Sequence, residues 1–430
     1  MASFSFGAGN AAKLARLPVY AAGRLVTLLV PRSRDLWVFG CAVGIADGAL
    51  ALWEVAATHG ERAVWLVATT SQARDASARG IPSIRKHSLR GFWATARARV
   101  VVVTHGFGDV NRYATHGAFV VQLWHGIPLK RIGLDSPETL RPPAALARGP
   151  LAGLARRALG LLYRRTARGI RLVPAASHVV RGRLESAFGL PDDRVPVTGE
   201  PRVDVLSRGT VAERSGSARE RIGELAGPLD PSSRLVLYAP TWRDGETDPA
   251  IPTAAEWRAI VDVLRRHDAV LLVRSHPLGA GEYAPPLGTE RVRGLGSDVL
   301  ADVTPLLPGL DALVTDYSSL MFDAALVPLP VVYLAPDVDS YARRRGFYGT
   351  YADVAGDDWA HDWSAAARRL DALLGDPDVA AAALERSRAL DNRVHDFRDG
   401  RNTTRVYRAI LAGLGRPLNT PAAGREEGRG

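Results

Sequence analysis

The sequence predicts an α/β protein with two doubly wound, Rossmann-like domains that face a common cleft. Three observations support this fold class. Short runs of β-branched and apolar residues recur along the chain, segments with helical apolar spacing separate them, and a Gly-, Ser- and Arg-rich segment at 207–233 divides them into two sets. The 430 residues suffice for two or three domains of common size. A ligand site is therefore expected between the domains, at the carboxyl ends of both sheets.

The first set of predicted elements contains four buried strands and one clear helix. The helix covers 46–59, with Leu50, Trp53 and Ala57 on one face. The apolar runs are nearly continuous, which is typical of strands covered on both faces of a parallel sheet. The predicted strands are 35–39, 63–68, 99–104 and 118–124.

The second set continues the same alternation. Strands are expected at 172–174, 195–198, 235–239, 270–274, 312–315 and 331–334. Helices are expected at 253–267, 319–325, 363–374 and 402–411. The predicted division is an N-terminal basic and apolar segment (1–34), two Rossmann-like domains (35–206 and 207–411) and a disordered tail (412–430).

Composition and charge narrow the function classes. The net charge is +10, which favours an anionic partner, although only three of the 55 basic residues are lysines and the arginine excess reads first as coding bias. The single Cys41 excludes internal disulfides and a cysteine zinc site. No secretory signal is evident, and the apolar segment 17–30 is too short to span a bilayer and contains Arg24.

The strand expected at 118–124 ends in the segment Leu-Trp-His-Gly-Ile-Pro-Leu-Lys. Its His125 would lie at the edge of the cleft. An imidazole titrates near neutral pH and suits a general base that acts on a hydroxyl group. A structural histidine, hydrogen-bonded in a turn, fits the same position.

Two strands of the second set end in residues that can contact an anion. Thr241 and Arg243 follow the strand at 235–239, where a plain strand-to-loop transition with a surface arginine is the alternative. Arg274 and His276 stand at the end of the strand at 270–274, where a turn histidine fits about as well. These segments alone do not choose between the interpretations.

Two further segments combine hydroxyl groups with a predicted helix start. Asp316, Ser318 and Ser319 follow the strand at 312–315, and free N–H groups there would bind phosphate, unless Ser318 only caps the helix. The segment 395–405 places three arginines and two hydroxyls before the last helix, as an anion site or a solvated basic cap. The sequence contains no P-loop, no His-Glu-x-x-His and no Gly-x-Ser-x-Gly motif.

Taken together and in this order, the motifs resemble the CDP-glycerol glycerophosphotransferase family, the teichoic acid primases and polymerases. The resemblance extends from about residue 36 to residue 412. The motifs that carry it are Trp124–Lys130, Gly199–Asp204, Ala239–Arg243, Thr315–Ser319 with Phe322–Asp323, Arg345–Tyr348 and Asp399–Arg401.

The resemblance implies a GT-B-like transferase. Its carboxyl-terminal domain would bind the CDP part of a CDP-alditol, and its amino-terminal domain would present a lipid-linked polyol-phosphate or glycan acceptor. An acceptor hydroxyl would attack the β-phosphorus and release CMP, most simply with glycerol phosphate as the transferred group, in the synthesis of teichoic acid or a related cell-surface polymer. No metal or cofactor is expected, because the sequence offers no evident carboxylate pair for a metal. Ile127 departs from the family's usual threonine beside the histidine, which leaves the alditol open.

The resemblance also implies roles for individual residues. His125 would be the base, and His276 would stabilise the leaving phosphate. Trp124, Gly126 and Lys130 would form the acceptor side. The donor side would be formed by Thr241, Arg243, Arg274, Asp316, Ser318, Ser319, Arg401 and Thr403.

Membrane contact is expected from two segments. The segment 144–172 combines Leu and Tyr with Arg at helical spacing, which suits an interfacial helix on anionic lipid and a lipid-linked acceptor. An arginine-rich surface helix is the alternative. With the N-terminal segment 1–34 as a second candidate, the expected location is cytoplasmic, peripheral on the inner face of the membrane.

Two other functions compete with this hypothesis. A GT-B glycosyltransferase that uses a nucleotide-sugar would share the architecture, but the ordered motif set disfavours it. A nucleic-acid-binding protein would explain the positive charge, but aromatic residues make up only 7% of the chain and the arginines are spread widely. No nucleic-acid partner is therefore expected.

Overall fold

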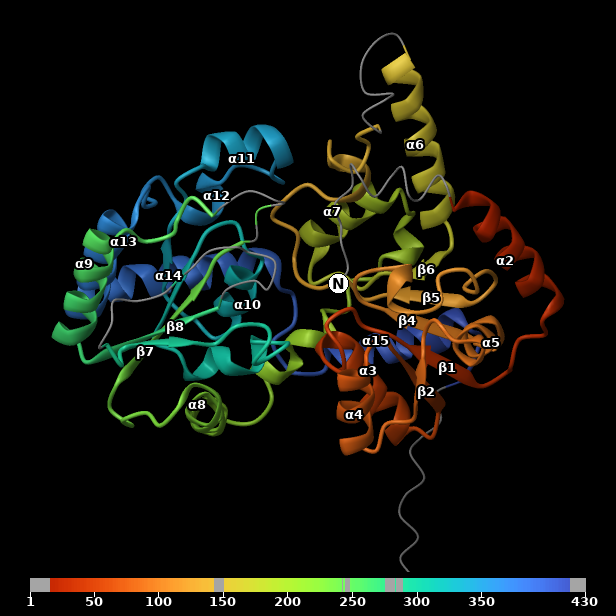
Figure 1. Cartoon of the computed structure of the whole chain (residues 1–430), viewed down its shortest axis with the longest axis horizontal. Helices are drawn as coiled ribbons and strands as arrows, with labels where there is room; N and C mark the ends of the chain where they lie inside the picture. The colour runs from red at the N-terminus through yellow and green to blue at the C-terminus, as the bar shows by residue number, and fades with distance from the viewer. Residues whose placement is uncertain are drawn as a thin grey trace, which may run out of the picture.

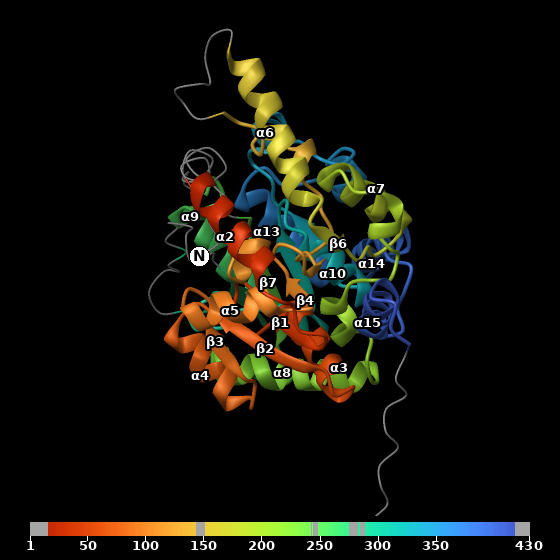
Figure 2. The same cartoon turned by 90° about the vertical axis from the view of Figure 1, so that its right-hand side faces the viewer.

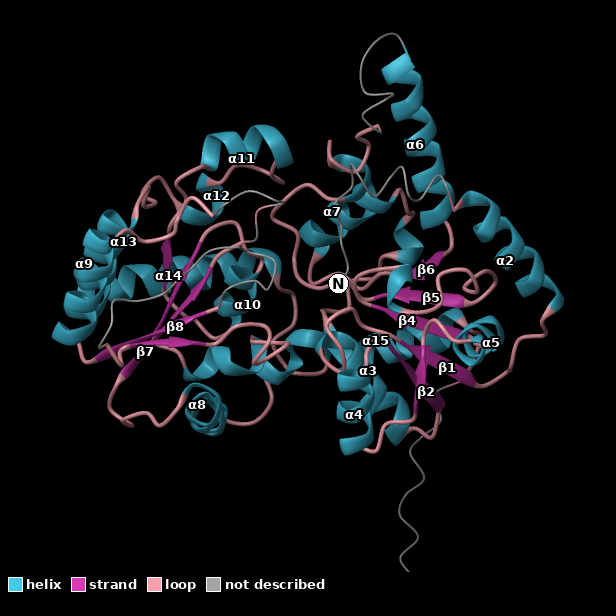
Figure 3. Cartoon of the chain, in the orientation of Figure 1, coloured by secondary structure: helices cyan, strands magenta, loops and turns pink. Residues whose placement is uncertain are grey.

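Two parallel β-sheets organise the chain, one in each of two lobes that lie side by side (Figure 1). The protein is described from a computed structural model, whose described residues are 16–142, 151–241, 243, 248–274, 283 and 289–417. In both lobes the strands lie inside and helices cover them (Figure 3). The doubly wound α/β fold class predicted from the sequence is confirmed.

The first sheet has the strand order β3-β2-β1-β4-β5-β6, and every neighbouring pair is parallel. β4 is buried at all four positions, as expected for a strand covered on both faces. The short strand β3 gives no apolar run in the sequence and was not predicted. The strands are β1 (Leu36–Phe39), β2 (Arg62–Val67), β3 (Ser83–Arg85), β4 (Val100–Val103), β5 (Phe119–Gln122) and β6 (Ile170–Leu172).

The second sheet repeats this plan with the order β11-β10-β7-β8-β9, again parallel throughout. In each sheet the strand order reverses at one place, between β1 and β4 and between β7 and β10. Open α/β sheets bind ligands at the carboxyl ends of the strands beside such a point. The strands are β7 (Arg234–Ala239), β8 (Ala269–Val273), β9 (Val292–Gly294), β10 (Ala312–Thr315) and β11 (Val331–Tyr333).

Side-chain caps define several helices of the first half. Thr69, Ser88 and Ser177 each accept a hydrogen bond from a backbone N–H in the first turn of the helix that follows them. The helices are α2 (Leu17–Leu29), α3 (Asp47–Thr58), α4 (Thr70–Ala78), α5 (Leu89–Arg97), α6 (Leu151–Ala167) and α7 (His178–Phe188).

The second half contains more helix than the sequence predicted. The segment 207–233, expected as a domain boundary, holds the capped helix α8, whose Ala218 and Ile222 are buried against the second sheet. Because the segment is rich in Gly, Ser and Arg, the helical spacing of its apolar residues was not recognised in the sequence. The helices are α8 (Val211–Ala226), α9 (Ala254–Arg266), α10 (Leu320–Leu326), α11 (Val338–Arg345), α12 (Ala352–Ala355), α13 (Trp363–Gly375), α14 (Pro377–Val394) and α15 (Asn402–Gly413).

The last helix crosses back to the first lobe, which corrects its expected place in the domain 207–411. Tyr407 of α15 lies 5.9 Å from Trp37 of β1, measured between ring centroids, and α15 buries its apolar face in the first domain's core. Residues 412–417, expected as the start of a disordered tail, belong to the described structure. The helix continues to Gly413, and Arg416 forms an ion pair with Glu61, whereas residues 418–430 lie outside the described residues.

One expected strand is absent from the described structure. The segment 195–198 forms only an isolated parallel bridge, between Val197 and Ala175, before the short 3₁₀ helix η5 (Pro201–Leu206). Pro196 lies in this segment and Pro201 follows it, and a proline has no backbone N–H to donate to a neighbouring strand. The strand pairing therefore does not extend.

The two lobes share an apolar core of their own. Ile127 and Leu129 of the first lobe are buried in one cluster with Tyr317, Phe322 and Phe347 of the second. The loops that carry the predicted site residues are therefore packed together. Figure 2 shows α2 and α6 on the outside of the first lobe, and Tyr163 of α6 packs against the edge of this core. Across the described residues, no helix has both the length and the hydropathy that crossing a bilayer requires.

Candidate active site

The loop that carries His125 touches the loop that carries Ser318 and Ser319. Gly126 has a φ of 127°, and a Cβ atom at this position would lie 2.7 Å from Ser319 Oγ. Glycine adopts this backbone conformation without strain, and its missing side chain admits the close approach. The structure thus brings together two segments from different domains, one predicted for the acceptor side and one for the donor side.

His125 follows β5 and lies half-buried against a second histidine. The His105 and His125 rings are parallel within 4°, with 4.2 Å between their centroids. The Trp124 ring covers His125 from another direction at 4.3 Å, and Trp124 itself has a φ of 64°. A positive φ is costly for a bulky residue, so packing against Phe188 must hold this turn in place.

This environment keeps His125 neutral at physiological pH. Burial lowers its pKa well below the ordinary value of 6.5, and the neighbouring His105, Arg202 and Lys130 act in the same direction. The Thr104 carbonyl oxygen lies 3.4 Å from Nδ1, which favours a hydrogen on that nitrogen and leaves Nε2 to accept a proton. No role was predicted for His105, although it follows β4 just as His125 follows β5.

Lys130 lies where the two domains are joined by backbone pairing. It forms an antiparallel bridge with Phe347, and the Arg131 N–H donates to the Gly346 carbonyl at 3.0 Å. Burial lowers the pKa of Lys130 to about 8, against the opposing effect of the Asp316 carboxylate. Among the described residues, no acceptor lies within hydrogen-bond distance of its Nζ.

Arg202 ties the two domains together beside this contact. Its Nε donates to Asp47 Oδ1 at 3.1 Å in the first domain, and its Nη2 donates to Thr304 Oγ1 at 3.0 Å in the second. Nη1 donates to Asp323 at 2.5 Å, and the Arg202 side chain is only 11% exposed. Asp47 has a φ of 63°, so its turn is strained to reach this partner. No role was predicted for Arg202, because its partners Asp47, Thr304 and Asp323 are distant in sequence.

The same network contains carboxyl groups with unused oxygens. Glu200 Oε2 and Asp323 Oδ1 are buried, and neither has a hydrogen-bond partner. Burial raises the pKa of Glu200 to about 8, against the opposing effect of Arg202, so this side chain is protonated at neutral pH. The pKa of Asp323 is also raised by burial.

Arg243 and Asp316, both expected at the donor site, instead form a closed scaffold. The Arg243 guanidinium donates to both carboxylate oxygens of Asp337, at 3.1 and 2.9 Å, and to Asp316 Oδ2 at 2.8 Å. Its faces are covered by Tyr317 and Tyr341, each 5.1 Å from the ring centroid to Cζ. With its donors occupied and only 4% of its side chain exposed, Arg243 does not present itself to a phosphate.

Two further residues expected on the donor side, Thr403 and Arg274, also have their donors occupied by the protein itself. Thr403 is fully buried and donates its hydroxyl to Asp204 Oδ2 at 2.6 Å, while Asp204 also accepts from the first N–H groups of α15. This carboxylate fills the expected anion site at the helix start. Arg274 donates to the carbonyls of Leu300 and Ala301, at 2.9 and 3.0 Å, and so holds a loop in place.

Several of the remaining predicted residues have polar atoms without a hydrogen-bond partner among the described residues. Ser318 Oγ accepts from the Leu320 N–H at 3.3 Å, but the N-cap residue of α10 is Ser319 and not Ser318, so the cap interpretation was wrong. Ser319 Oγ has no described partner. Thr241 Oγ1 is buried without a partner, and the Arg401 side chain is exposed. His276 lies outside the described residues. Within the described part of the chain, no group of three His, Cys, Asp or Glu side chains is placed to hold a metal ion.

Comparison with known proteins gives a family match and two curated relatives. The profile of the family described as CDP-Glycerol:Poly(glycerophosphate) glycerophosphotransferase matches residues 26–412. A teichoic acid glycerol-phosphate transferase of Staphylococcus aureus is 28% identical over 63% of this chain and 66% of its own length. A teichoic acid poly(glycerol phosphate) polymerase of Staphylococcus epidermidis is 31% identical over 54% of this chain and 31% of its own. The chain thus spans less than two thirds of either relative.

Solved structures of the wall teichoic acid polymerase TagF share the fold. One has a TM-score of 0.72 at 22% identity and covers 94% of this chain and 96% of its own. A histidine-to-asparagine variant of that polymerase with CDPG has a TM-score of 0.73 at 21% identity and covers 92% of this chain and 93% of its own. This likeness, together with the two facing parallel sheets, confirms the GT-B-like architecture predicted from the sequence.

Proposed function

Because the chain belongs to the CDP-glycerol:poly(glycerophosphate) glycerophosphotransferase family, we propose that it transfers an alditol phosphate from a CDP-alditol to an acceptor hydroxyl. Glycerol phosphate is the proposed group, and a lipid-linked polyol-phosphate or glycan of a teichoic acid-like polymer is the proposed acceptor. The TagF variant with CDPG supports the choice of donor. The observation that supports the proposal is the close approach of Gly126, the residue after His125, to Ser319 of the other domain.

The proposed step uses the neutral form of His125. Its Nε2 takes the proton of the acceptor hydroxyl, whose oxygen attacks the β-phosphorus of the donor. The bond from that phosphorus to the bridging oxygen breaks, and CMP leaves with the bond's electron pair. Ser318 and Ser319 donate to the phosphate oxygens as charge moves onto the leaving group, and positioning supplies most of the effect. His276 stays a sequence-based proposal for the same task, and no metal or cofactor takes part in the proposed step.

Turnover of labelled donor tests this proposal. Purified protein with radiolabelled CDP-glycerol and a lipid-linked acceptor is expected to release CMP and extend the acceptor, whereas UDP-sugars give no product. His125→Ala should abolish transfer while CDP-glycerol binding stays near the wild-type affinity. The exposed His361 provides the matched control, since His361→Ala should leave turnover unchanged. Wild-type turnover in His125→Ala would end the base assignment.

The hydroxyl pair has a separate test on donor affinity. Ser318→Ala with Ser319→Ala is expected to weaken CDP-glycerol binding by about tenfold, because two hydrogen bonds to a charged group are lost. Ser71→Ala with Ser77→Ala removes two exposed hydroxyls elsewhere and serves as the control in the same titration calorimetry. Equal donor affinity in both double variants would remove the phosphate role of Ser318 and Ser319.

The apolar surfaces of α2 and α6 support a peripheral location on the inner, anionic face of the membrane. In α2, Leu25 and Leu29 are 62% and 79% exposed, and in α6, Leu154 and Leu161 are 65% and 69% exposed. Both helices lie on the outside of the first lobe (Figure 2). α6 also carries two arginines in its last turn, and basic amphipathic helices bind anionic lipid surfaces.

Vesicle flotation tests the membrane proposal. Replacing the four exposed leucines of α2 and α6 by glutamine should abolish co-flotation with phosphatidylglycerol vesicles. The control is Leu89→Gln with Val211→Gln, because these two side chains are 90% and 74% exposed on other surfaces. Equal flotation of the two variants would overturn the assignment of α2 and α6 as the membrane-binding surface.

A further inference from the structure

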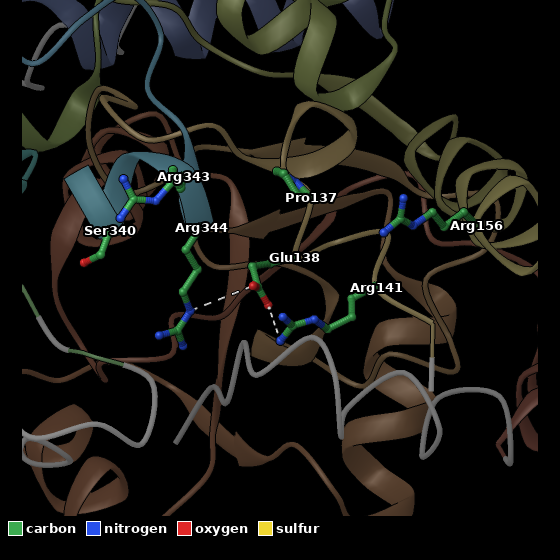
Figure 4. Close-up of a pocket in the computed structure, with 7 residues that line it drawn as sticks. All are labelled: Pro137, Glu138, Arg141, Arg156, Ser340, Arg343 and Arg344. Carbon is green, nitrogen blue, oxygen red and sulfur yellow. Dashed lines mark ion pairs between the residues drawn. The ribbon is translucent and has the colours of Figure 1, made fainter. Parts of the chain in front are cut away.

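Arginines from three elements converge on a cavity of about 370 Å³ (Figure 4). Arg156 comes from α6 in the first lobe, and Arg343 and Arg344 come from α11 in the second. Arg141 lies in the segment between η2 (Gly133–Asp135) and α6. The remaining lining residues are Pro137, Glu138 and Ser340.

The charge in this cavity is strongly unbalanced. Among the described residues that line the cavity, four arginines and one carboxylate, that of Glu138, give an excess of three positive charges. Glu138 lies 3.3 Å from Arg141 and 3.9 Å from Arg344, so it links the two lobes. No described acidic side chain pairs with Arg156 or Arg343, and both are exposed. A concave surface with such an excess attracts anions.

The walls of the cavity continue directly into the segments beside His125. Helix α11 ends at Arg345, and Phe347 then pairs with Lys130, five residues after His125. On the other wall, Pro137 follows Asp135, which accepts a hydrogen bond from Tyr348 at 2.6 Å. Arg156 lies on the same helix as the exposed Leu154 and Leu161. The segments that line the cavity therefore connect α6 with the paired residues Lys130 and Phe347.

We propose that this cavity binds phosphate groups of the acceptor, while the acceptor's terminal hydroxyl reaches the His125 loop. The ligand class is a phosphodiester or pyrophosphate, whose oxygens accept paired hydrogen bonds from planar guanidinium groups. The inference rests on the proposed function, since it concerns the same acceptor. It adds that the enzyme selects acceptors which already carry phosphate, so an uncharged glycan is a poor acceptor.

Charge-neutral variants of the two unpaired arginines test the site. In Arg156→Gln with Arg343→Gln, affinity for a synthetic tetramer of glycerol phosphate should fall by about tenfold, and the acceptor KM should rise by a similar factor. The affinity for CDP-glycerol should not change. Arg265→Gln with Arg388→Gln removes the same charge from side chains that are 63% and 54% exposed, and it should bind the tetramer as the wild type does.

Vesicle binding separates a polymer site from a lipid headgroup site. The proposal predicts that the Arg156 and Arg343 double variant still floats with phosphatidylglycerol vesicles while it loses the soluble tetramer. Loss of vesicle binding with unchanged tetramer affinity would assign these arginines to the lipid surface and overturn the proposal. Equal tetramer affinity in both double variants would also overturn it. If the wild type binds the tetramer but transfers nothing from CDP-glycerol, the proposed function fails and the phosphate site stands.

Discussion

Two clusters of polar residues at the carboxyl ends of strands differ in how their polar atoms are used. Around Arg243, the guanidinium is held by Asp316 and Asp337 and covered by Tyr317 and Tyr341. Arg243 thereby stabilises the scaffold of the second domain. An arginine at a strand end therefore does not by itself indicate an anion site.

Around His125 the polar atoms are left open instead. His105 stacks on the ring and Trp124 packs against it at a tilt, rather than strong hydrogen bonds holding it, while Ser319 of the other domain lies against the adjacent Gly126 with an unpartnered hydroxyl among the described residues. Burial lowers the pKa of His125 without a carboxylate to reverse it. The contrast shows how the two kinds of site differ. Polar groups whose hydrogen bonds are all made within the protein have a structural role, whereas polar groups that are held in place without a partner are candidates for a chemical role.

Removal of Arg243 should produce the largest loss of stability. Arg243→Ala leaves the buried Asp316 carboxylate without its partner, which costs about 3–5 kcal/mol. Arg221→Ala breaks an ion pair whose side chains are 53% and 54% exposed, so its cost should stay below about 1 kcal/mol. Urea unfolding of the two variants measures this difference. Similar midpoints would show that the Arg243 cluster is not a scaffold.

The two clusters show which features of the fold and the site could be predicted from the sequence. The strand ends, the two sheets and the Trp-His-Gly loop were predictable, because apolar runs and local motifs carry them. The partners of Arg243, Thr403 and Arg274 were not, since Asp337, Asp204 and the loop after β9 are distant in sequence. Whether a polar group in a motif is free depends on such long-range partners.

The approach of the two loops can be broken at Gly126. Gly126→Ala should lower kcat by about tenfold, because its Cβ would meet Ser319 Oγ at 2.7 Å and its φ of 127° is strained for alanine. Gly60→Ala is the matched control, since Gly60 has a φ of 74° and nothing lies within 4 Å of a Cβ there. Steady-state kinetics should show near-normal turnover for Gly60→Ala. Full activity in Gly126→Ala would mean that the contact with Ser319 does not matter for transfer.

Glu200, in the buried network around Arg202, should make the stability of the protein depend on pH. Burial raises the pKa of Glu200 from 4.5 to about 8 in the folded protein. The folded state therefore holds a proton that the unfolded state releases, so this group makes stability fall as pH rises from 4.5 to 8. Glu200→Gln removes that proton, and its Tm should exceed the wild-type Tm by about 2–4 °C more at pH 8 than at pH 5. A difference in Tm that is the same at both pH values would contradict the assignment.

The placement of the last helix shows the same limit at the level of the fold. The apolar spacing of 402–411 predicted the helix itself. Its return to the first domain depends on Asp204, which accepts the N–H groups of Asn402 and Thr403, and on Trp37, which packs on Tyr407. Neither partner is near α15 in sequence. The local apolar pattern therefore determines that the segment is a helix, and contacts with residues distant in sequence determine which domain the helix packs against.

The pH dependence of transfer tests most directly whether His125 is a neutral base in the cleft. The account predicts that kcat/KM for the acceptor falls on the acid side with an apparent pKa below 6.5, because burial disfavours the charged imidazole. His105→Gln should move this limb toward higher pH, since the neighbouring ring adds to the lowering of the pKa of His125. A limb at or above pH 6.5 in the wild type, or the same profile in both proteins, would contradict the claim.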